Sequence, residues 1–155
     1  MVPGRESRMV DVRNSGLLAA SMKYFARAHV WAYQRTGGVL GARLLWLPAA
    51  LITTTGRRTG RERTTATLCL RDGDRIVLPA SFGGRDHDPA WYLNIKDDPD
   101  VRVQFGSDER DMTARDATPE ERNRYWPKLT RMYPPYRGYR EAADRVIPLV
   151  ICEPR

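Results

Sequence analysis

The segment that decides the fold is LPAALITTTGRRTGRERTTATLCLR, residues 47–71. Leu47–Thr55 and Arg63–Arg71 are rich in β-branched and apolar residues, which favour strands. Gly56 and Gly60 bound the short stretch between them, and glycine adopts the turn conformations that other residues avoid. The segment therefore predicts a β-hairpin.

The chain after this hairpin continues as an antiparallel meander. A second turn lies at residues 72–74, and short apolar or alternating segments predict strands over residues 75–81, 101–105, 111–117 and 146–152. Apolar spacing and capping signals predict helices over residues 17–34, 90–96 (with Asp88 as N-cap) and 118–132, the last opened by a capping box. Consecutive strands without intervening helices disfavour a Rossmann-type domain. We expect an α+β fold, a small barrel of about six antiparallel strands with flanking helices.

The chain length favours one domain. It has 155 residues, and its apolar stretches are shorter than the roughly 20 residues that span a bilayer. We expect residues 1–16 to form a flexible N-terminal segment and residues 17–155 to form the domain. The N-terminus has no apolar export signal, which predicts a cytoplasmic protein. Cys69 and Cys152 lie in apolar segments and are expected to be buried free thiols.

Arginine dominates the charge of the chain. The formal net charge is +7, and the basic residues other than Lys23, Lys96 and Lys128 are all arginines. Such a surface attracts anions, and three classes stay open: nucleic acid, acidic lipid headgroups and a phosphorylated cofactor. Four arginines converge on the hairpin turn: Arg57, Arg58, Arg61 and Arg63. Guanidinium groups bind phosphate in a bidentate manner, so this turn is either an anion site or an ordinary charged surface turn.

Several families of catalytic sites are excluded by their missing motifs. The sequence has no HExxH, no paired CxxC, no GxSxG and no P-loop, so no metal site is expected. His29 and His87 stand alone and are not expected to be catalytic bases.

Three tyrosines recur at intervals of three residues: Tyr133, Tyr136 and Tyr139. Pro134 and Pro135 interrupt a helix, which predicts that the tyrosines lie on a stiff loop. A phenol is protonated at neutral pH and donates a hydrogen bond or a proton. Packing is the alternative reason for this spacing.

The first predicted helix, over residues 17–34, has an apolar face that includes Leu18, Met22, Phe25 and Tyr33. Two interpretations stay open. The helix packs on the core, which we favour, or it contacts a membrane surface through its apolar residues and the neighbouring basic ones.

Five motifs occur together in the chain, and they resemble those of one family. The motifs are Thr53–Arg61, Pro79–Gly84, Pro89–Asn94, Ala114–Ala117 and Tyr133–Tyr136. In this order, over Val30 to Pro154, they are similar to the deazaflavin-dependent nitroreductase and quinone reductase family of actinobacteria. The combination is specific, although each motif alone is weak.

This resemblance implies a fold, a cofactor and a reaction. The fold would be a split β-barrel similar to that of FMN-binding oxidases. The enzyme would be an oxidoreductase that transfers a hydride from the reduced deazaflavin F420 to a menaquinone-like quinone or a nitro-heterocycle. Several members associate with the membrane, which implies peripheral membrane contact through the N-terminal helix at the inner face of the plasma membrane. A homo-oligomer is expected by analogy.

The resemblance also assigns roles to individual residues. The turn that binds the phosphate and tail of the cofactor would be Arg57, Arg58, Thr59 and Arg63. The wall beside the ring would be Pro79, Ala80, Ser81 and Trp91. The substrate pocket would hold Tyr133, Tyr136 and Tyr139. Tyr136 would stabilise the developing oxyanion with help from Tyr133 and Ser81, which makes these three the expected catalytic residues.

The sequence departs from the family pattern at two positions. Arg58 stands where lysine is common, and Phe82 follows the serine where some members have lysine. The first change keeps the positive charge, whereas the second removes a cation near the site and weakens the case for nitro reduction. Two alternative functions stay open: an FMN-binding paralogue of the same barrel and a nucleic-acid-binding barrel.

Overall fold

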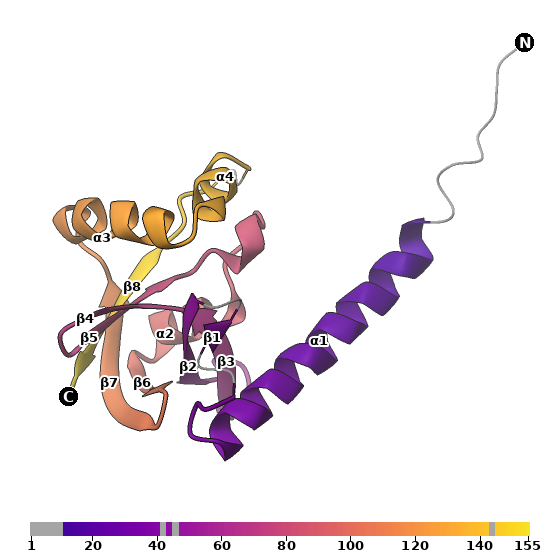
Figure 1. Cartoon of the computed structure of the whole chain (residues 1–155), viewed down its shortest axis with the longest axis horizontal. Coiled ribbons are helices and arrows are strands. Elements are labelled where there is room, and N and C mark those ends of the chain that lie inside the picture. Colours follow the sequence, from indigo (N-terminus) through magenta and orange to yellow (C-terminus); the bar gives the residue numbers. More distant parts are fainter. Residues whose placement is uncertain (1–10, 41–42, 45–46, 143–144) are drawn as a thin grey trace, which may run out of the picture.

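The computed structural model describes residues 11–40, 43–44, 47–142 and 145–155. The helices are α1 (Asp11–Arg35), α2 (Ala90–Asp97), α3 (Pro119–Met132) and α4 (Pro135–Ala142), with a short 3-10 turn η1 (Phe82–Gly84). The strands are β1 (Arg43–Leu44), β2 (Leu47–Thr55), β3 (Glu62–Leu68), β4 (Leu70–Asp72), β5 (Arg75–Pro79), β6 (Asp100–Phe105), β7 (Asp108–Asp116) and β8 (Leu149–Pro154). Figure 1 shows a curled sheet with α3 and α4 above it and α1 extending away from it.

The sheet is antiparallel throughout and its strand order is β1-β2-β6-β7-β8-β5-β4, with β3 paired to β2. The predicted hairpin is confirmed, since β2 and β3 pair from Thr55 opposite Glu62 to Ala49 opposite Leu68. The α+β class is confirmed as well.

The strand expected over residues 63–71 is in fact two strands. β3 ends at Leu68 and pairs with β2, whereas β4 begins at Leu70 and pairs with β5. The fully buried Cys69 lies at the bend between them, and its backbone N–H donates to the carbonyl oxygen of Pro48. This bend carries the chain from one end of the sheet to the other. Together with the two-residue β1, it raises the expected six strands to the eight of the described chain.

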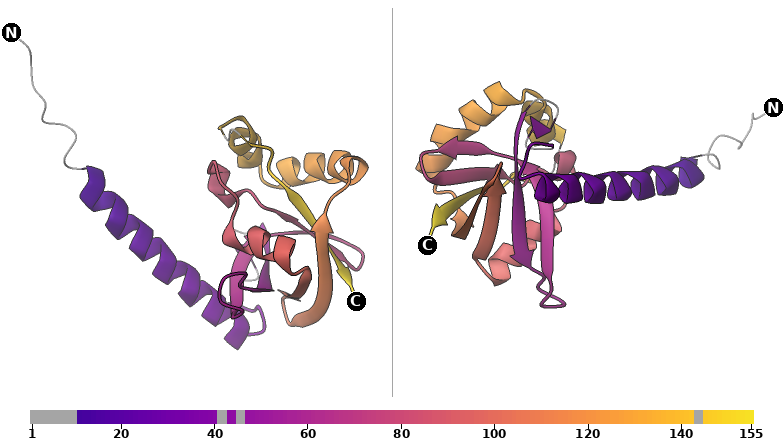
Figure 2. Two further views of the ribbon diagram at one scale, coloured as in Figure 1. Left: turned by 180° about the vertical axis from the view of Figure 1, so that it is seen from behind. Right: turned by 60° about the horizontal axis from the view of Figure 1, so that its bottom comes forward.

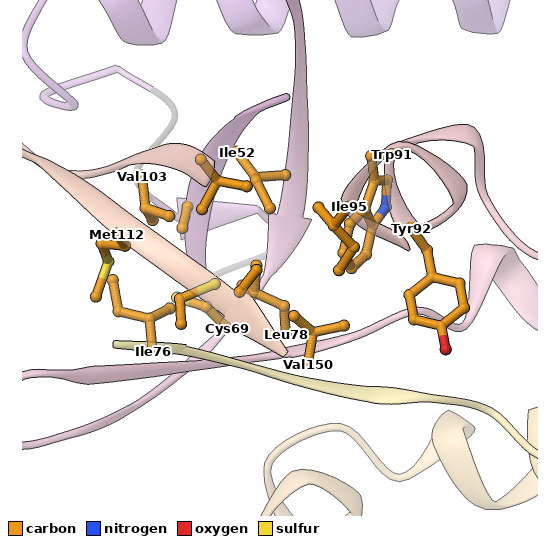
Figure 3. Packing of buried hydrophobic residues seen from close by; sticks show 14 of the residues in the cluster. Ile52, Cys69, Ile76, Leu78, Trp91, Tyr92, Ile95, Val103, Met112 and Val150 are labelled. Carbon is orange, nitrogen blue, oxygen red and sulfur yellow. The ribbon is translucent and has the colours of Figure 1, made fainter. Parts of the chain in front are cut away.

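Two clusters of buried side chains lie on opposite faces of β5 and β8. Ile76 and Leu78 face the barrel interior, whereas Val77 between them faces α3 and α4. The interior cluster also takes Trp91 and Ile95 from α2, as Figure 3 shows. Each fully buried aliphatic side chain contributes about 1.5–3 kcal/mol to folding. Because both faces of these strands are covered, α4 is held beside the end of β5.

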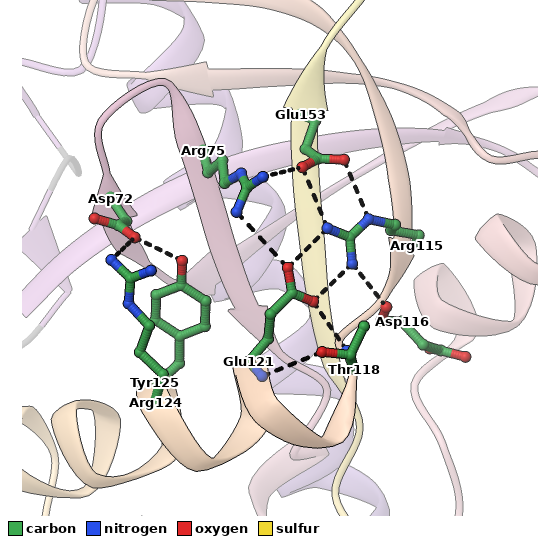
Figure 4. A network of polar contacts seen from close by, with 9 residues as sticks. All are labelled: Asp72, Arg75, Arg115, Asp116, Thr118, Glu121, Arg124, Tyr125 and Glu153. Carbon is green, nitrogen blue, oxygen red and sulfur yellow. Dashed lines mark hydrogen bonds and ion pairs between the residues drawn. The ribbon is translucent and has the colours of Figure 1, made fainter.

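The start of α3 is fixed by hydrogen bonds and ion pairs, shown in Figure 4. Thr118 and Glu121 form the predicted capping box, in which each side chain accepts from the backbone N–H of the other residue. The Glu121 carboxylate also accepts from two nitrogens of Arg115 at 2.7 and 2.8 Å. Arg115 and Arg75 both reach Glu153 on β8. The network therefore ties α3 to β5, β7 and β8.

Helix α1 differs from the sequence prediction in start and in packing. It begins at Asp11, so residues 11–16, expected in a flexible segment, are helical, and residues 1–10 lie outside the described residues. Figures 1 and 2 show that most of α1 projects away from the barrel. Met22 and Phe25 are 65% and 69% exposed, so the favoured expectation that this face packs on the core is wrong for them. The side chains before residue 20 are outside the described set.

The C-terminal end of α1 is nevertheless firmly attached. Tyr33 is fully buried, and its hydroxyl donates to the carbonyl oxygen of Ala49 at 3.0 Å and accepts from the N–H of Gly106 at 2.7 Å. A Cβ on Gly38 would lie 2.4 Å from the Gly106 backbone, so the chain after α1 needs glycine there. None of the described helices is both long and apolar enough to cross a bilayer.

Two further expectations need correction. Tyr136 and Tyr139 lie on helix α4 rather than on a stiff loop, because Pro134 precedes the helix and Pro135 is its first residue, where proline is well tolerated. Tyr133 is the C-cap of α3. Helix α2 begins at Ala90, as expected, but its N-cap is Pro89 and not Asp88.

The capping network predicts an acid-sensitive contribution to stability. Hydrogen bonds from Arg115 and from the Thr118 backbone lower the pKa of Glu121 from 4.5 to about 2. A lowered carboxyl pKa stabilises the fold above the unfolded value, and this contribution is lost as the pH falls towards 2. We expect Glu121→Gln to lower the free energy of unfolding at pH 7 by about 1–2 kcal/mol.

Urea unfolding followed by circular dichroism at several pH values measures this effect. The difference between Glu121→Gln and wild type should shrink between pH 4.5 and 2. Glu120→Gln, at an exposed position on the same turn, is the matched control. Equal acid profiles for wild type and Glu121→Gln would contradict the assignment.

Candidate functional site

A cleft of about 470 Å³ opens between β3, the end of β5, the start of α2 and α4. Its lining includes Thr65–Leu68, Pro79, Ser81–Gly83, Pro89–Trp91, Tyr133, Tyr136 and Tyr139. Most of this lining is apolar or aromatic, with a few hydroxyl groups, which is the usual make-up of a small-molecule site. The hydroxyls are contributed by different elements and meet in the cleft.

The three tyrosines form one cluster. The ring centroids of Tyr133 and Tyr136 are 4.9 Å apart, and the Tyr139 ring lies 6.0–6.1 Å from both. The hydroxyls of Tyr133 and Tyr139 are hydrogen-bonded at 3.2 Å. The side chain of Ser81 lies near the hydroxyl of Tyr136 and lowers its pKa. These contacts join α4 to the loop after β5.

The surroundings of Tyr136 keep its phenol protonated. Tyr136 is 2% exposed, and burial is the main reason that its pKa is raised above 10, followed by the neighbouring Tyr133 and Tyr139. The side chain of Ser81 acts in the opposite direction, because it stabilises the ionised form. The raised pKa means that Tyr136 remains a hydrogen-bond donor at neutral pH and beyond pH 10.

The loop after β5 has an unusual backbone. Phe82 has φ +48°, and among the described residues it is the non-glycine residue in the left-handed region. Gly83 and Gly84 follow with φ +65° and +76°. A Cβ on Gly84 would lie 3.0 Å from the Tyr139 ring, so glycine lets the loop approach α4. Strained backbone of this kind is common at functional sites.

Helix α2 connects the cleft to the arginine turn. Trp91 is 6% exposed and lines the cleft, and Asn94 lies one turn further along the helix. The buried Asn94 amide donates to the Thr54 hydroxyl at 3.0 Å and accepts from the backbone N–H of Arg57 at 3.2 Å. One short helix therefore contacts both parts of the predicted site.

The arginine turn is a tight, exposed loop between β2 and β3. The backbone N–H of Gly56 donates to the carbonyl oxygen of Arg61 at 2.8 Å, and Gly60 has φ +66°. The side chains of Arg57, Arg58 and Arg63 are exposed. Within the described ranges, none of them has a carboxylate at ion-pair distance. The turn thus presents guanidinium groups that are available to an anionic ligand.

The structure brings together part of the predicted site. Pro79, Ser81, Trp91 and the three tyrosines all line the cleft. Ala80 is fully buried beside the lining, and its carbonyl oxygen is held by Arg145. Arg57, Arg58, Thr59 and Arg63 do not line the cleft. The first three lie in the β2–β3 turn, and Arg63 lies at the start of β3. The predicted residues therefore form two groups joined by α2.

Sequence reasoning missed two sets of residues. The wall formed by Thr65, Ala66 and Thr67 was predicted as part of a strand and not as a binding surface. Asn94 and Arg145 were also missed, since each acts through backbone groups of residues distant in sequence. Asn94 belongs to the Pro89–Asn94 motif, in which no role was predicted for this residue, and Arg145 carries no local signal.

A second and larger groove, of about 840 Å³, lies between α1 and β3. Its walls include Met22, Phe25 and Trp31, whose side chains are 62–69% exposed, and Thr64–Ala66 of β3. We assign the site to the smaller cleft, because the tyrosine hydroxyls, Ser81 and Trp91 converge there. No cluster of metal-ligating side chains is present among the residues described.

A family profile and a similar protein of known class agree with each other. A sequence profile described as F420H(2)-dependent quinone reductase matches residues 25–154. An F420H(2)-dependent quinone reductase of Mycobacterium tuberculosis is 34% identical over 129 residues, which are 81% of this chain and 87% of that protein.

Solved structures that are similar to this chain agree with the sequence comparisons. An F420-H2 dependent reductase, FDR-A, has a TM-score of 0.64 and 38% identity, and the match covers 68% of this chain and 94% of that one. A chain solved as a domain-swapped dimer has a TM-score of 0.66 and 35% identity, covering 82% of this chain and 96% of that one. A pyridoxamine 5′-phosphate oxidase-type protein from Listeria innocua, 13% identical with a TM-score of 0.50, shares the fold alone over 69% of this chain. The expected split barrel is thereby confirmed.

Proposed function

Because the chain belongs to the F420H(2)-dependent quinone reductase family, we propose how its own residues serve that reaction. The enzyme class and the reduced F420 cofactor expected from the sequence are confirmed by this membership. The roles of individual residues, the nitro acceptor and the partner contacts are our proposals.

The described residues fit a cofactor that has a planar ring and an anionic tail. The cleft has an aromatic and apolar wall, and the turn beyond α2 carries arginines without carboxylate partners. Pro79, Ala80, Ser81 and Trp91 would hold the ring. Arg57, Arg58, Thr59 and Arg63 would hold the phosphate and tail, since guanidinium forks match phosphate geometry.

When bound, the reduced deazaflavin supplies two electrons as a hydride. The protein must then stabilise the negative charge that develops on the acceptor oxygen. Tyr136 donates a hydrogen bond or a proton to that oxygen, and Tyr133 and Ser81 assist it. The observation that carries this proposal is the buried Tyr136, which lines the cleft together with Ser81 and has a pKa above 10. A fixed donor in a site that excludes water is worth more than the same donor in water.

The acceptor is a quinone of the menaquinone type, which matches the apolar wall formed by β3 and the tyrosine rings. A nitro-heterocycle is a second candidate acceptor, because the same hydroxyl donors would stabilise charge on a nitro oxygen. Phe82, where some members carry lysine, offers no cation to assist nitro reduction. We therefore place the quinone first.

Replacing Tyr136 by Phe tests the proposed donor. We expect kcat with a menaquinone analogue to fall about 100-fold, because positioned proton donors contribute at least this much. The dissociation constant of F420 should change less than about threefold, since the aromatic wall remains. Stopped-flow absorbance and fluorescence titration measure the two quantities.

Tyr125→Phe is the control for loss of a buried hydroxyl, since the hydroxyl of Tyr125 binds Asp72 away from the cleft. An unchanged kcat in Tyr136→Phe would refute the assigned role.

Charge reversal at the turn tests the proposed tail site. We expect Arg57→Glu and Arg58→Glu each to weaken F420 binding about tenfold or more, with a larger effect at low salt, because exposed charges are screened. Arg131→Glu, at an exposed position on α3 away from the turn, makes the same change of charge and serves as the control. FMN titrated alongside F420 distinguishes the FMN-binding alternative. Equal affinity of wild type and both turn variants for F420 would contradict this location of the tail.

We further propose that the apolar face of α1 packs against a second copy of this chain. Met22, Phe25 and Trp31 are 62–69% exposed and line one groove, and a similar chain is a domain-swapped dimer. The groove between α1 and β3 would receive the helix of the partner. Peripheral membrane contact through the same face stays a prediction.

The double variant Phe25→Glu, Trp31→Glu should convert a dimer into a monomer, as measured by light scattering after gel filtration. Val39→Glu, at an 85% exposed position beyond the helix, should leave the dimer unchanged. A monomeric wild type at about 100 μM would refute the dimer. Binding of that monomer to anionic vesicles would then favour the membrane interpretation.

A further inference from the structure

One guanidinium group holds the loop that carries Ser81. Arg145 lies shortly before β8, and its Nη2 donates to the carbonyl oxygens of Ala80 at 3.2 Å and Ser81 at 3.1 Å. Its Nε donates to the carbonyl oxygen of Arg85 at 2.9 Å, and its Nη1 binds the Asp88 carboxylate at 2.8 Å. The Arg145 side chain is 14% exposed. Arg145 therefore contacts the loop at its beginning, near its middle and at its end.

These contacts fix the backbone on both sides of Ser81. The carbonyls of Ala80 and Ser81 belong to the two peptide groups that flank the Ser81 α-carbon. Because each peptide group is planar, holding both carbonyls holds φ and ψ of Ser81, at −74° and −34°. The direction in which the Ser81 side chain leaves the backbone is then fixed as well.

The next residue explains why the loop needs an external restraint. Phe82 has φ +48°, a conformation that costs a non-glycine residue about 1 kcal/mol or more. The two glycines that follow have few backbone restrictions of their own. Without Arg145, this segment would have several accessible conformations, and the Ser81 hydroxyl would lose its fixed direction.

The pairing of β5 with β8 brings Arg145 beside the loop that carries Ser81. Pro79 pairs with Leu149, and the N–H of Ala80 donates to the carbonyl oxygen of Pro148 at 2.9 Å, so the ladder continues beyond β5. The chain leaving β5 and the chain entering β8 therefore run side by side. Arg145 does not line the cleft, so it acts on the site through the loop.

We propose that Arg145 is a positioning residue that aims the Ser81 hydroxyl at Tyr136 and at the cofactor ring, an inference that rests on the role of Ser81 proposed above. A lysine could keep the ion pair with Asp88, but its single nitrogen cannot reach three carbonyl groups at these separations. Arg145→Lys therefore separates charge from geometry. Arg145→Gln removes both.

A double-mutant cycle with Ser81→Ala tests the proposal. We expect Arg145→Gln to lower kcat about 10- to 100-fold, the usual cost of a small misplacement at a reacting centre, with F420 affinity changed less than about threefold. In the Ser81→Ala background, the same substitution should add less than about threefold, because the group that it positions is already absent. Equal losses in both backgrounds would overturn the proposal.

The ligand-free protein gives a second readout. The side chain of Ser81 lowers the pKa of Tyr136, so Ser81→Ala, Arg145→Gln and Arg145→Lys should each raise it. NMR of ring-labelled tyrosine, assigned with Tyr136→Phe, measures this pKa. Hydrogen exchange of residues 81–88 should be faster in both Arg145 variants. Unchanged pKa and unchanged exchange in folded Arg145→Lys would refute the inference.

One control variant and one comparison distinguish a failure of the positioning role from a failure of the proposed function. Arg110→Gln removes an arginine that pairs with Asp74 and Asp108, and it should leave kcat, exchange and the Tyr136 pKa unchanged. If Ser81→Ala leaves kcat unchanged, the proposed function of Ser81 fails, whatever Arg145 does to the loop. If Ser81→Ala lowers kcat and Arg145→Lys does not, the positioning role fails and the proposed function stands.

Discussion

The geometry of the site depends on the side-chain amide of Asn94. This amide is buried, and it joins the end of β2 through Thr54, the arginine turn through the N–H of Arg57, and helix α2 on which it lies. A buried amide without partners costs about 1–3 kcal/mol, so the three elements are held in one arrangement. Trp91 is three residues earlier on the same helix and lines the cleft. The separation between the arginines and the cleft is thus set by one turn of helix.

The opposite side of the cleft depends on strands buried on both faces. β5 and β8 contribute alternate side chains to the barrel interior and to the layer under α3 and α4. Such strands cannot shift by one residue without exchanging the two sets. Tyr136 packs in the second layer with Trp126, while its hydroxyl reaches Ser81 at the end of β5. The core that stabilises the fold therefore also fixes the position of the proposed proton donor.

Local patterns predicted some elements well. The hairpin and the capping box at Thr118 were identifiable because their signals lie within a few consecutive residues. The bend at Cys69 and helix α4 were missed, because the first is set by pairing with two separate strands and the second begins at prolines that we interpreted as a break. The grouping of Ser81 with the tyrosines came from the family resemblance. Their convergence in one cleft could be seen in the structure alone.

The role of the arginines is a second feature that the sequence alone could not predict, because it depends on contacts between distant residues. A net charge of +7 suggested a broad anionic partner, but seven arginines outside the turn form ion pairs within the described chain. Ion pairs with nearby carboxylates engage Arg75, Arg102, Arg110, Arg115, Arg124, Arg145 and Arg155. These pairs neutralise one another and tie strands to helices, so they add little to the field that a ligand meets. The exposed guanidinium groups of the β2–β3 turn lack such partners within the described chain, so this turn offers an anionic tail several adjacent positive charges that no carboxylate neutralises.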